Sequence, residues 1–163
     1  MEQDVLVLIF EHNNWANRRM IKACAALSDD QLDAEPQTAT KGSIRATLIH
    51  LVSAQLGYLS LLTEPMEART RANPSFGDLE KAAQASGEGL LALVKGRTGE
   101  GSTARLRTAD GYWVEPWVVM VQIIDHASEH REQISSKLTE LSVTPPDLDG
   151  WSYGEVTEAL TAA

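Results

Sequence analysis

The sequence predicts an all-α protein, a four-helix bundle with a small β-hairpin before the last long helix. Four long segments repeat apolar residues at helical spacing, and loops of moderate length separate them. A single Asp-Gly pair between short alternating segments indicates the hairpin. The 163 residues are a usual length for one domain, and no internal repeat interrupts them. We therefore expect a single domain spanning residues 1–163.

The first helix is predicted over residues 2 to about 27, with apolar side chains on one arc. His12 and Arg19 fall within this arc although both are polar, and a polar side chain there needs a partner or water. We expect both at the helix edge with their polar ends in water. The alternative is that His12 lines a pocket beside a metal. Ser28-Asp29-Asp30 ends this helix or caps a short following turn.

The second helix is predicted from Ile44 to about Leu62, after a loop over residues 34–42. Ser43 is a suitable N-cap for it. The helix is apolar almost all round, so we expect it to be buried on more than one side. It is then either central to the bundle or part of a subunit interface.

The third helix is predicted to run to about Lys95, beginning at Ser75 or Asp78 after a polar loop over residues 63–74. Two glycines within it, at positions 87 and 89, each cost about 1 kcal/mol relative to alanine. The prediction of a helix here depends on its apolar stripe.

The hairpin is predicted from two short alternating segments, 103–108 and 112–114, that follow a break over residues 96–101. Ala109-Asp110-Gly111 lies between them. Asp-Gly in this context predicts a type I′ turn.

The last long helix is predicted from Pro116, a suitable first helical residue, to about Leu141. Thr144-Pro145-Pro146 ends it. A short helix is expected over residues 154–160.

Two histidines in the last long helix lie four residues apart, so His126 and His130 project from the same face. Spacings of three and four from Ile123 and Ile134 predict that both lie near the middle of the apolar stripe and point into the core. Each ring has two nitrogens to satisfy, which a shared divalent metal would help to do. The alternative is that both are structural histidines.

A metal needs a third ligand, and His50 on the second helix is the best available, with His12 as the alternative. Three nitrogens around a divalent ion leave a position open for water or substrate, as in catalytic zinc sites. Structural zinc sites usually contain cysteines, and this chain has only Cys24. We expect Cys24 to be a small buried apolar residue of the first helix.

Composition excludes some partners. The chain has 14 Lys and Arg against 23 Asp and Glu, a formal net charge of -9, which argues against nonspecific binding to nucleic acid or to anionic membrane. No signal-peptide pattern opens the chain, and no uninterrupted apolar run approaches the length of a membrane span. We expect a soluble cytoplasmic protein.

At this point the chain resembles a known family over nearly its whole length, the DinB/YfiT-like metalloenzymes. This is the DNA-damage-inducible group, unrelated to the polymerase that shares the name. The resemblance rests on the order and spacing of four segments: Asn14-Trp15-Ala16-Asn17-Arg18-Arg19, Gly42-Ser43-Ile44-Arg45-Ala46-Thr47-Leu48-Ile49-His50-Leu51, His126-Ala-Ser-Glu-His130-Arg131-Glu-Gln133-Ile134, and Pro145-Pro146-Asp147-Leu148-Asp149 with Tyr153. Glu132 stands where the family frequently has glycine.

The resemblance implies an up-and-down four-helix bundle, a zinc or nickel site formed by His50, His126 and His130, frequent homodimers and a role in stress responses. Relatives include mycothiol-dependent maleylpyruvate isomerase and bacillithiol transferases, so a low-molecular-weight thiol is a candidate cosubstrate. Most members have no assigned reaction. The resemblance therefore favours a metal-dependent transferase, isomerase or hydrolase that acts on a small-molecule substrate, with a non-catalytic metal-binding or ligand-binding stress protein as the alternative.

The catalytic residues are not identified by the sequence. His126-Ala-Ser-Glu129-His130 matches the H-x-x-E-H pattern of inverted zinc peptidases, in which Glu129 would be the general base. Glu129 and His12 are the two candidates for a catalytic role. A five-residue pattern arises easily by chance, and a small bundle offers no evident peptide cleft.

Overall fold

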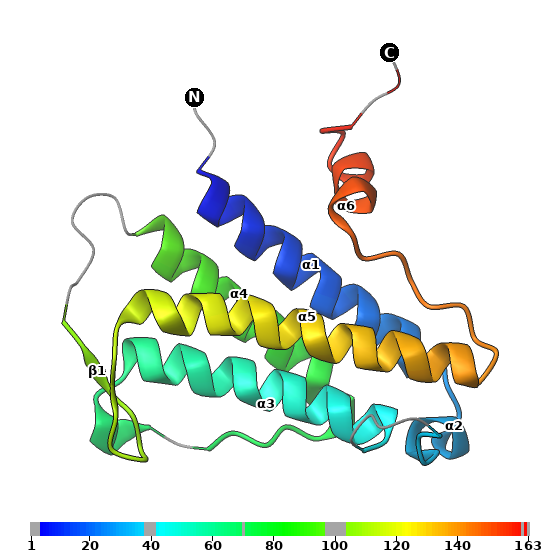
Figure 1. Ribbon diagram of the computed structural model, residues 1–163, viewed down its shortest axis with the longest axis horizontal. Helices are drawn as coiled ribbons and strands as arrows, with labels where there is room; N and C mark the ends of the chain where they lie inside the picture. Colours follow the sequence, from blue (N-terminus) through cyan, green and yellow to red (C-terminus); the bar gives the residue numbers. More distant parts are fainter. Residues whose placement is uncertain (1–3, 38–41, 70, 97–103, 161, 163) are drawn as a thin grey trace.

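The computed structural model of the chain describes residues 4–37, 42–69, 71–96, 104–160 and 162. Within these residues four long helices lie side by side (Figure 1), which confirms the predicted all-α class. The helices are α1 Val5–Ala25, α2 Asp29–Asp33, α3 Ile44–Thr63, α4 Leu79–Lys95, α5 Pro116–Glu140 and α6 Gly150–Val156; the 3-10 helices are η1 Met66–Ala68 and η2 Phe76–Asp78; the strands are β1 Leu106–Arg107 and β2 Trp113–Val114. Parts of three predicted segments, residues 2–3 of the first helix, 38–41 of the first loop and 97–103 before the hairpin, lie outside the described residues, as does residue 70.

The helices follow one another around the bundle in the order α1, α4, α3, α5, because these are the pairs that pack together. Helices α3 and α4 run in the same direction: Gln55 contacts Ser86, and Leu59 lies against Gly89 one turn further along both helices. The connection between them therefore returns along the length of α3 before α4 begins (Figure 1). In this respect the path departs from the simple alternation of an up-and-down bundle.

The core consists of two apolar clusters, one toward each end of the bundle. One cluster contains Met20, Leu48 and Ile134, and the other contains Phe10 and Leu90. The predicted buried cysteine belongs to the first cluster: Cys24 is fully buried, and its burial raises the pKa of the thiol to about 12. The interpretation of Cys24 as a structural residue fits this environment, because a thiol with a raised pKa is a poor nucleophile.

A polar layer separates the two clusters and joins all four long helices. Arg131 of α5 is only 5% exposed, and its Nη1 donates to the amide oxygens of Asn13 (2.8 Å) and Asn17 (2.6 Å) on α1. The Nδ2 of Asn17 donates to Gln55 of α3 (2.9 Å), whose Nε2 donates to Ser86 of α4 (2.7 Å). Burial lowers the pKa of Arg131 to about 10.

The starts of the helices follow local capping chemistry. Ser28 accepts a hydrogen bond from the backbone of Gln31, whose side chain in turn accepts from the Ser28 backbone, so a capping box starts α2. The Ser43 hydroxyl accepts from the backbone of Ala46 at 3.2 Å and starts α3 as predicted.

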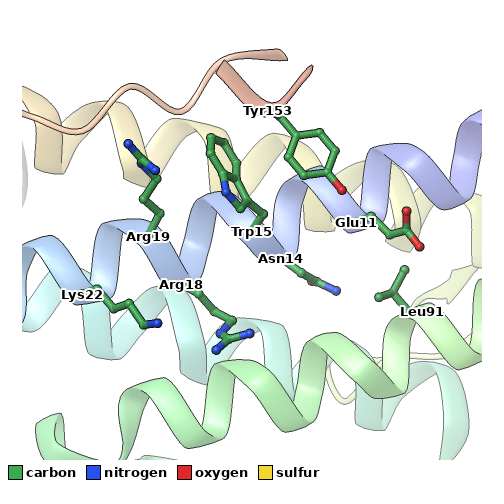
Figure 2. A pocket seen from close by; sticks show the side chains of 8 residues that line it. All are labelled: Glu11, Asn14, Trp15, Arg18, Arg19, Lys22, Leu91 and Tyr153. Carbon is green, nitrogen blue, oxygen red and sulfur yellow. The ribbon is translucent and has the colours of Figure 1, made fainter. Parts of the chain in front are cut away.

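The short C-terminal helix lies earlier than predicted. The prediction placed it over residues 154–160, but α6 begins at Gly150 because Asp149 is its N-cap and accepts from the Ser152 backbone at 2.8 Å. Tyr153 of α6 packs against Trp15 of α1, with 5.2 Å between ring centroids (Figure 2). This contact holds α6 against the bundle.

The hairpin is confirmed, with β1 antiparallel to β2, but the predicted turn type is wrong. The predicted type I′ turn needs positive φ at both Asp110 and Gly111, and Asp110 does not have it. Gly111 has a φ of 94°, and its backbone donates to Thr108 at 3.1 Å. A three-residue loop ending in a left-handed glycine therefore closes the hairpin.

Helix α3 is long and apolar enough to cross a membrane by length and composition, with a mean hydropathy of 1.3 over its most apolar window. The core helix of a soluble protein passes the same test. In the bundle α3 packs against both α4 and α5, with its buried residues on the faces toward them. The six buried residues of α3 lie at spacings of three and four along one stripe, so the helix is buried along one broad face and not on more than one side as predicted.

Candidate metal centre

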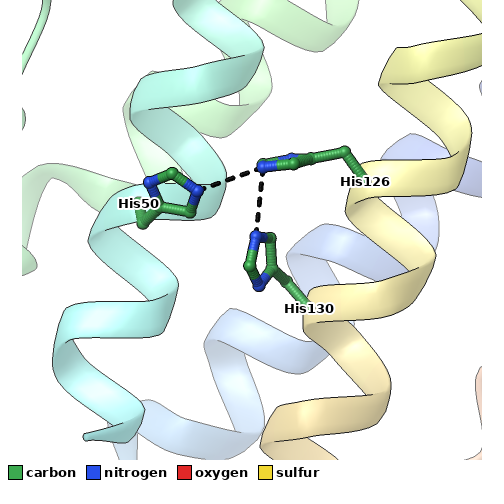
Figure 3. Close-up of side chains that lie close together, drawn as sticks. All are labelled: His50, His126 and His130. Carbon is green, nitrogen blue, oxygen red and sulfur yellow. Dashed lines mark hydrogen bonds between the residues drawn. The ribbon is translucent and has the colours of Figure 1, made fainter. Parts of the chain in front are cut away.

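Three histidines from two antiparallel helices meet between α3 and α5 (Figure 3). The Nε2 atom of His126 lies 3.1 Å from Nε2 of His50 and 3.0 Å from Nε2 of His130. One ring nitrogen from each residue lies within 4.8 Å of the other two. The structure thus brings together the three residues that the sequence singled out as candidate ligands.

The histidines lie at the edge of the core, and the prediction that His126 and His130 point into it away from water is wrong. Both are half-buried, and His50 is exposed. The inward face of α5 at this level is occupied by Ala127 and Arg131, which are buried. The histidine group is therefore partly open to solvent.

The surroundings favour neutral imidazoles. Burial, followed by the neighbouring His130 and His50, lowers the pKa of His126 to about 4. Burial and then His130 also lower the pKa of His50. Metal ligation requires an unprotonated ring nitrogen, so both residues are in the ligating form at neutral pH.

Hydrogen bonding among the three rings satisfies them poorly. A neutral ring nitrogen carries either one proton or one lone pair, yet Nε2 of His126 is in contact with two other ring nitrogens. A divalent ion would accept a lone pair from all three. Zinc–nitrogen bonds of about 2.0–2.1 Å in a tetrahedral arrangement separate neighbouring nitrogens by about 3.3 Å. The two observed distances are close to this value, so the residues fit a metal.

Gln133 orients one of the rings, and the sequence interpretation did not identify this role. The Nδ1–H of His130 donates to Oε1 of Gln133 at 2.9 Å. With the proton held on Nδ1, the Nε2 lone pair is directed toward the other two histidines. The signal in the sequence was that Gln133 follows His130 by three positions in a helix, which places the two side chains next to each other on one face.

Tyr58 is a second neighbour that the sequence interpretation missed. Its ring packs edge-on against His126, with 5.8 Å between centroids and an interplanar angle of 85°. Tyr58 lies on α3, eight residues after His50, so it extends the site by about two helical turns toward the end of α3.

Glu129 does not join the histidine group. Its side chain is exposed, and the group that could hold a metal within the described residues contains the three histidines alone. The peptidase pattern therefore has its two histidines in the group, whereas the carboxylate that would be its general base lies outside the group.

His12 contacts the C-terminal segment that leads into α6. Its Nε2–H donates to the backbone carbonyl of Leu148 at 2.8 Å, and its ring contacts Trp15 and Tyr153 at 5.8 and 5.5 Å. His12 is not a member of the histidine group. These contacts assign it to fastening the C-terminal segment rather than to a pocket beside the metal ligands.

Arg19 is exposed, as expected, with its guanidinium 5.4 Å from the centre of the Trp15 ring. It borders a cavity of about 480 Å³ between α1, α4 and α6 (Figure 2). None of the three histidine ligand candidates lines this cavity.

Comparison with solved structures shows a similar fold. The chain is similar to a DinB-like protein from Bacillus cereus ATCC 10987, with a TM-score of 0.67 and 16% sequence identity. The match covers 87% of this chain and 94% of the other. A search of curated proteins gave no match.

The family follows from the sequence itself. A sequence model described as the DinB family matches residues 1–161, nearly the whole chain. This match agrees with the helical fold and with the resemblance drawn from the histidine-containing segments. The chain belongs to the DinB family.

Proposed function

We propose that this protein is a metal-dependent enzyme that holds one divalent ion through His50, His126 and His130 and acts on a small molecule. The observation that carries the proposal is the convergence of three ring nitrogens, at 3.0 and 3.1 Å from one to the next. Imidazole ligands suit zinc and nickel, which are the proposed metals.

The chain supplies three ligands, which leaves coordination positions open to a reactant, as catalytic sites require. The ion, when bound, would lower the pKa of a coordinated water or thiol or polarise a substrate carbonyl. The reactions that fit are transfer or isomerisation with a low-molecular-weight thiol as cosubstrate, and hydrolysis.

The residues around the site prepare it for this role. Gln133 fixes the ring of His130, and the lowered pKa values keep His50 and His126 unprotonated. Tyr58 lies beside His126 and borders the neighbouring cavity, so its hydroxyl is the candidate to donate a hydrogen bond to a bound reactant.

A non-catalytic metal-binding or ligand-binding protein is the second candidate. It is favoured by the absence of a carboxylate from the histidine group among the described residues, since Glu129 is exposed. A thermal-shift screen of low-molecular-weight thiols with metal-loaded protein separates the two. Stabilisation by a thiol, followed by turnover of an electrophile with that thiol, would favour the enzyme.

The first prediction is a stoichiometry of one metal ion per chain. Elemental analysis of protein grown with added zinc or nickel should give close to one equivalent. His126→Ala and His130→Ala should lose the metal, and His50→Ala should bind it much more weakly, because each change removes one of three ligands.

His12→Ala is the matched control, since His12 lies outside the group, and it should keep about one equivalent. Circular dichroism would establish that each variant is helical. Unchanged metal content in both α5 variants would rule out the site.

A further inference from the structure

The connection between α3 and α4 forms one wall of a large cavity. It runs back alongside α3 (Figure 1), and residues 71–73 face that helix across a space of about 950 Å³. This volume is within the usual range of about 300–1,000 Å³ for small-molecule sites. The wall formed by α3 presents small and apolar residues, among them Ala46, Ile49, Ala54 and Gly57.

The cavity adjoins the histidine group through two residues. His50 lines the cavity and is one of the three histidines. Tyr58 also lines it, and its ring packs against His126. A molecule in this cavity would therefore have one end beside the metal centre.

Arg71 is the one residue with a permanent charge among the described residues that line the cavity. Asn73, two residues further along the same wall, adds an amide. An anion is the ligand that a guanidinium and an amide would bind, because both donate hydrogen bonds.

Five of the twelve lysines and arginines that the structure describes form ion pairs with carboxylates, and Arg71 is not among them. Ion pairs join Arg18 and Lys22 to Glu80, Arg45 to Asp29 and Asp33, Lys95 to Glu11, and Arg105 to Glu115. In the part of the chain that the structure describes, no carboxylate lies within ion-pair distance of Arg71. A protein with a net charge of -9 thus keeps an unpaired guanidinium at the cavity beside its histidine group.

We propose that Arg71 binds the carboxylate of a small organic acid in this cavity, while the other end of the acid reaches the three-histidine centre. This inference rests on the proposed metal function and names its substrate class. A guanidinium matches a carboxylate by two parallel hydrogen bonds, and the small apolar side chains of α3 suit a short carbon skeleton. Arg71 is thereby a specificity-determining residue.

The test uses cobalt-loaded protein and two matched series of thiols with two, three or four carbons. The acid series is mercaptoacetate, 3-mercaptopropionate and 4-mercaptobutyrate, and the neutral series is the mercapto-alcohols of the same length. A thiolate that reaches the metal gives a sulfur-to-cobalt charge-transfer band, so affinity is read by absorbance and corrected for the pKa of each thiol. At one or more chain lengths the acid should bind about fivefold to tenfold more tightly than the alcohol, as one charge-assisted pair provides.

Two variants locate the effect. Arg71→Gln should abolish the preference for the acid, and Arg71→Lys should keep part of it. Arg107→Gln, which removes the same charge from an exposed residue of β1 outside the cavity, should leave the preference unchanged. Chelation of cobalt by the carboxylate itself would survive in Arg71→Gln and would overturn the assignment.

The outcomes separate this inference from the proposed function. Equal affinity for acid and alcohol at every length, with cobalt bound at one equivalent, would overturn the role of Arg71 and leave the metal centre intact. Failure of the protein to bind cobalt at all would overturn the proposed function and this inference with it.

Discussion

Arg131 is the single buried side chain whose loss we expect to cost most. Its guanidinium donates to Asn13, Asn17 and Ser128, and all three acceptors are neutral. Arg131→Ala would leave two buried amide oxygens without this donor and open a space between the apolar clusters. We expect the free energy of unfolding to fall by about 2–4 kcal/mol in urea titrations.

Arg105→Ala is the control for this prediction. Arg105 forms an exposed ion pair with Glu115 at 2.9 Å, and such pairs contribute about 0–1 kcal/mol. Equal effects of the two substitutions would contradict the importance of the polar layer.

The lowered pKa of His126 predicts how the stability of the metal-free protein depends on pH. The pKa is 6.5 for an unperturbed histidine and about 4 in the folded protein. Between these values the unfolded chain binds a proton that the folded chain does not, so the free energy of unfolding falls as the pH is lowered from 6.5 to 4. Below pH 4 both states are protonated and this loss is complete. The pKa of His50 is also lowered in the folded protein, so His50 contributes to the pH dependence with the same sign.

Urea titrations at several pH values in the presence of a chelator would measure this slope. His126→Gln removes the titrating group, so its stability should depend less steeply on pH over the same interval. With metal added, the stabilisation should also weaken toward acid, because protons compete for the ring nitrogens. A slope equal to that of the unchanged protein would contradict the assignment to His126.

At the scale of the helices, the close approach of α1 to α4 depends on Gly87. A Cβ at this position would meet the side-chain atoms of Asn14 at 2.7–2.9 Å, and the Nδ2 of Asn14 donates to the Gly87 carbonyl at 2.9 Å. Alanine normally improves a helix by about 1 kcal/mol, but Gly87→Ala should destabilise the protein because Asn14 must move and lose its hydrogen bond.

Gly57→Ala in α3 is the matched control, since nothing lies within 4 Å of its added Cβ. This substitution should raise the melting temperature, while Gly87→Ala should lower it. Stabilisation by both would show that the two helices separate easily. The glycines of α4 that seemed to weaken it in the sequence, Gly87 and Gly89, are thus contact points with α1 and α3.

Signals within a few residues of sequence predicted the helices well. Ser43 and Pro116 lie at the starts of α3 and α5 because capping and the fixed φ of proline act locally. Asp149 carried the same kind of signal and was overlooked, which displaced the predicted α6. Periodicity alone could not reveal that α3 and α4 run in the same direction, because a helical stripe reads alike in both directions.

The candidate site was predictable in part. The spacing of His126 and His130 placed them on one face, but a helical wheel did not separate the middle of the stripe from its edge. Arg131 occupies the inward position, and its partners come from α1, a contact between residues more than 100 positions apart. Such pairings depend on how the helices pack, and no local pattern encodes them.

Across the whole molecule, the polar layer and the α3–α4 connection have different structural roles. Arg131 and its amide partners fix the relative positions of all four long helices at the level of the histidines. The connection leaves the core and covers the outer face of α3, where it adds Arg71 to the surroundings of His50. Rigid helices thus position the three histidines, and an irregular segment supplies the cavity wall that carries Arg71.

The last prediction concerns assembly. The sequence indicated a homodimer from the apolar character of α3, but most large apolar side chains of α3 are at least half-buried within one chain. Four exposed apolar residues instead lie close together in the chain, just before and within β2 and at the start of α5: Tyr112, Trp113, Trp117 and Val121. An apolar patch of this kind is typical of an interaction surface.

We therefore expect a homodimer that buries this patch, with a sedimentation mass of twice 17.8 kDa at micromolar concentration. Trp117→Glu places a charge at the patch and should give the monomer, because an unpaired charge is costly to bury. Trp151→Glu, which changes a similarly exposed tryptophan on α6, should leave the dimer intact. A monomeric unchanged protein would exclude the dimer. A dimer that survives Trp117→Glu and dissociates in Leu61→Glu would instead locate the interface on α3.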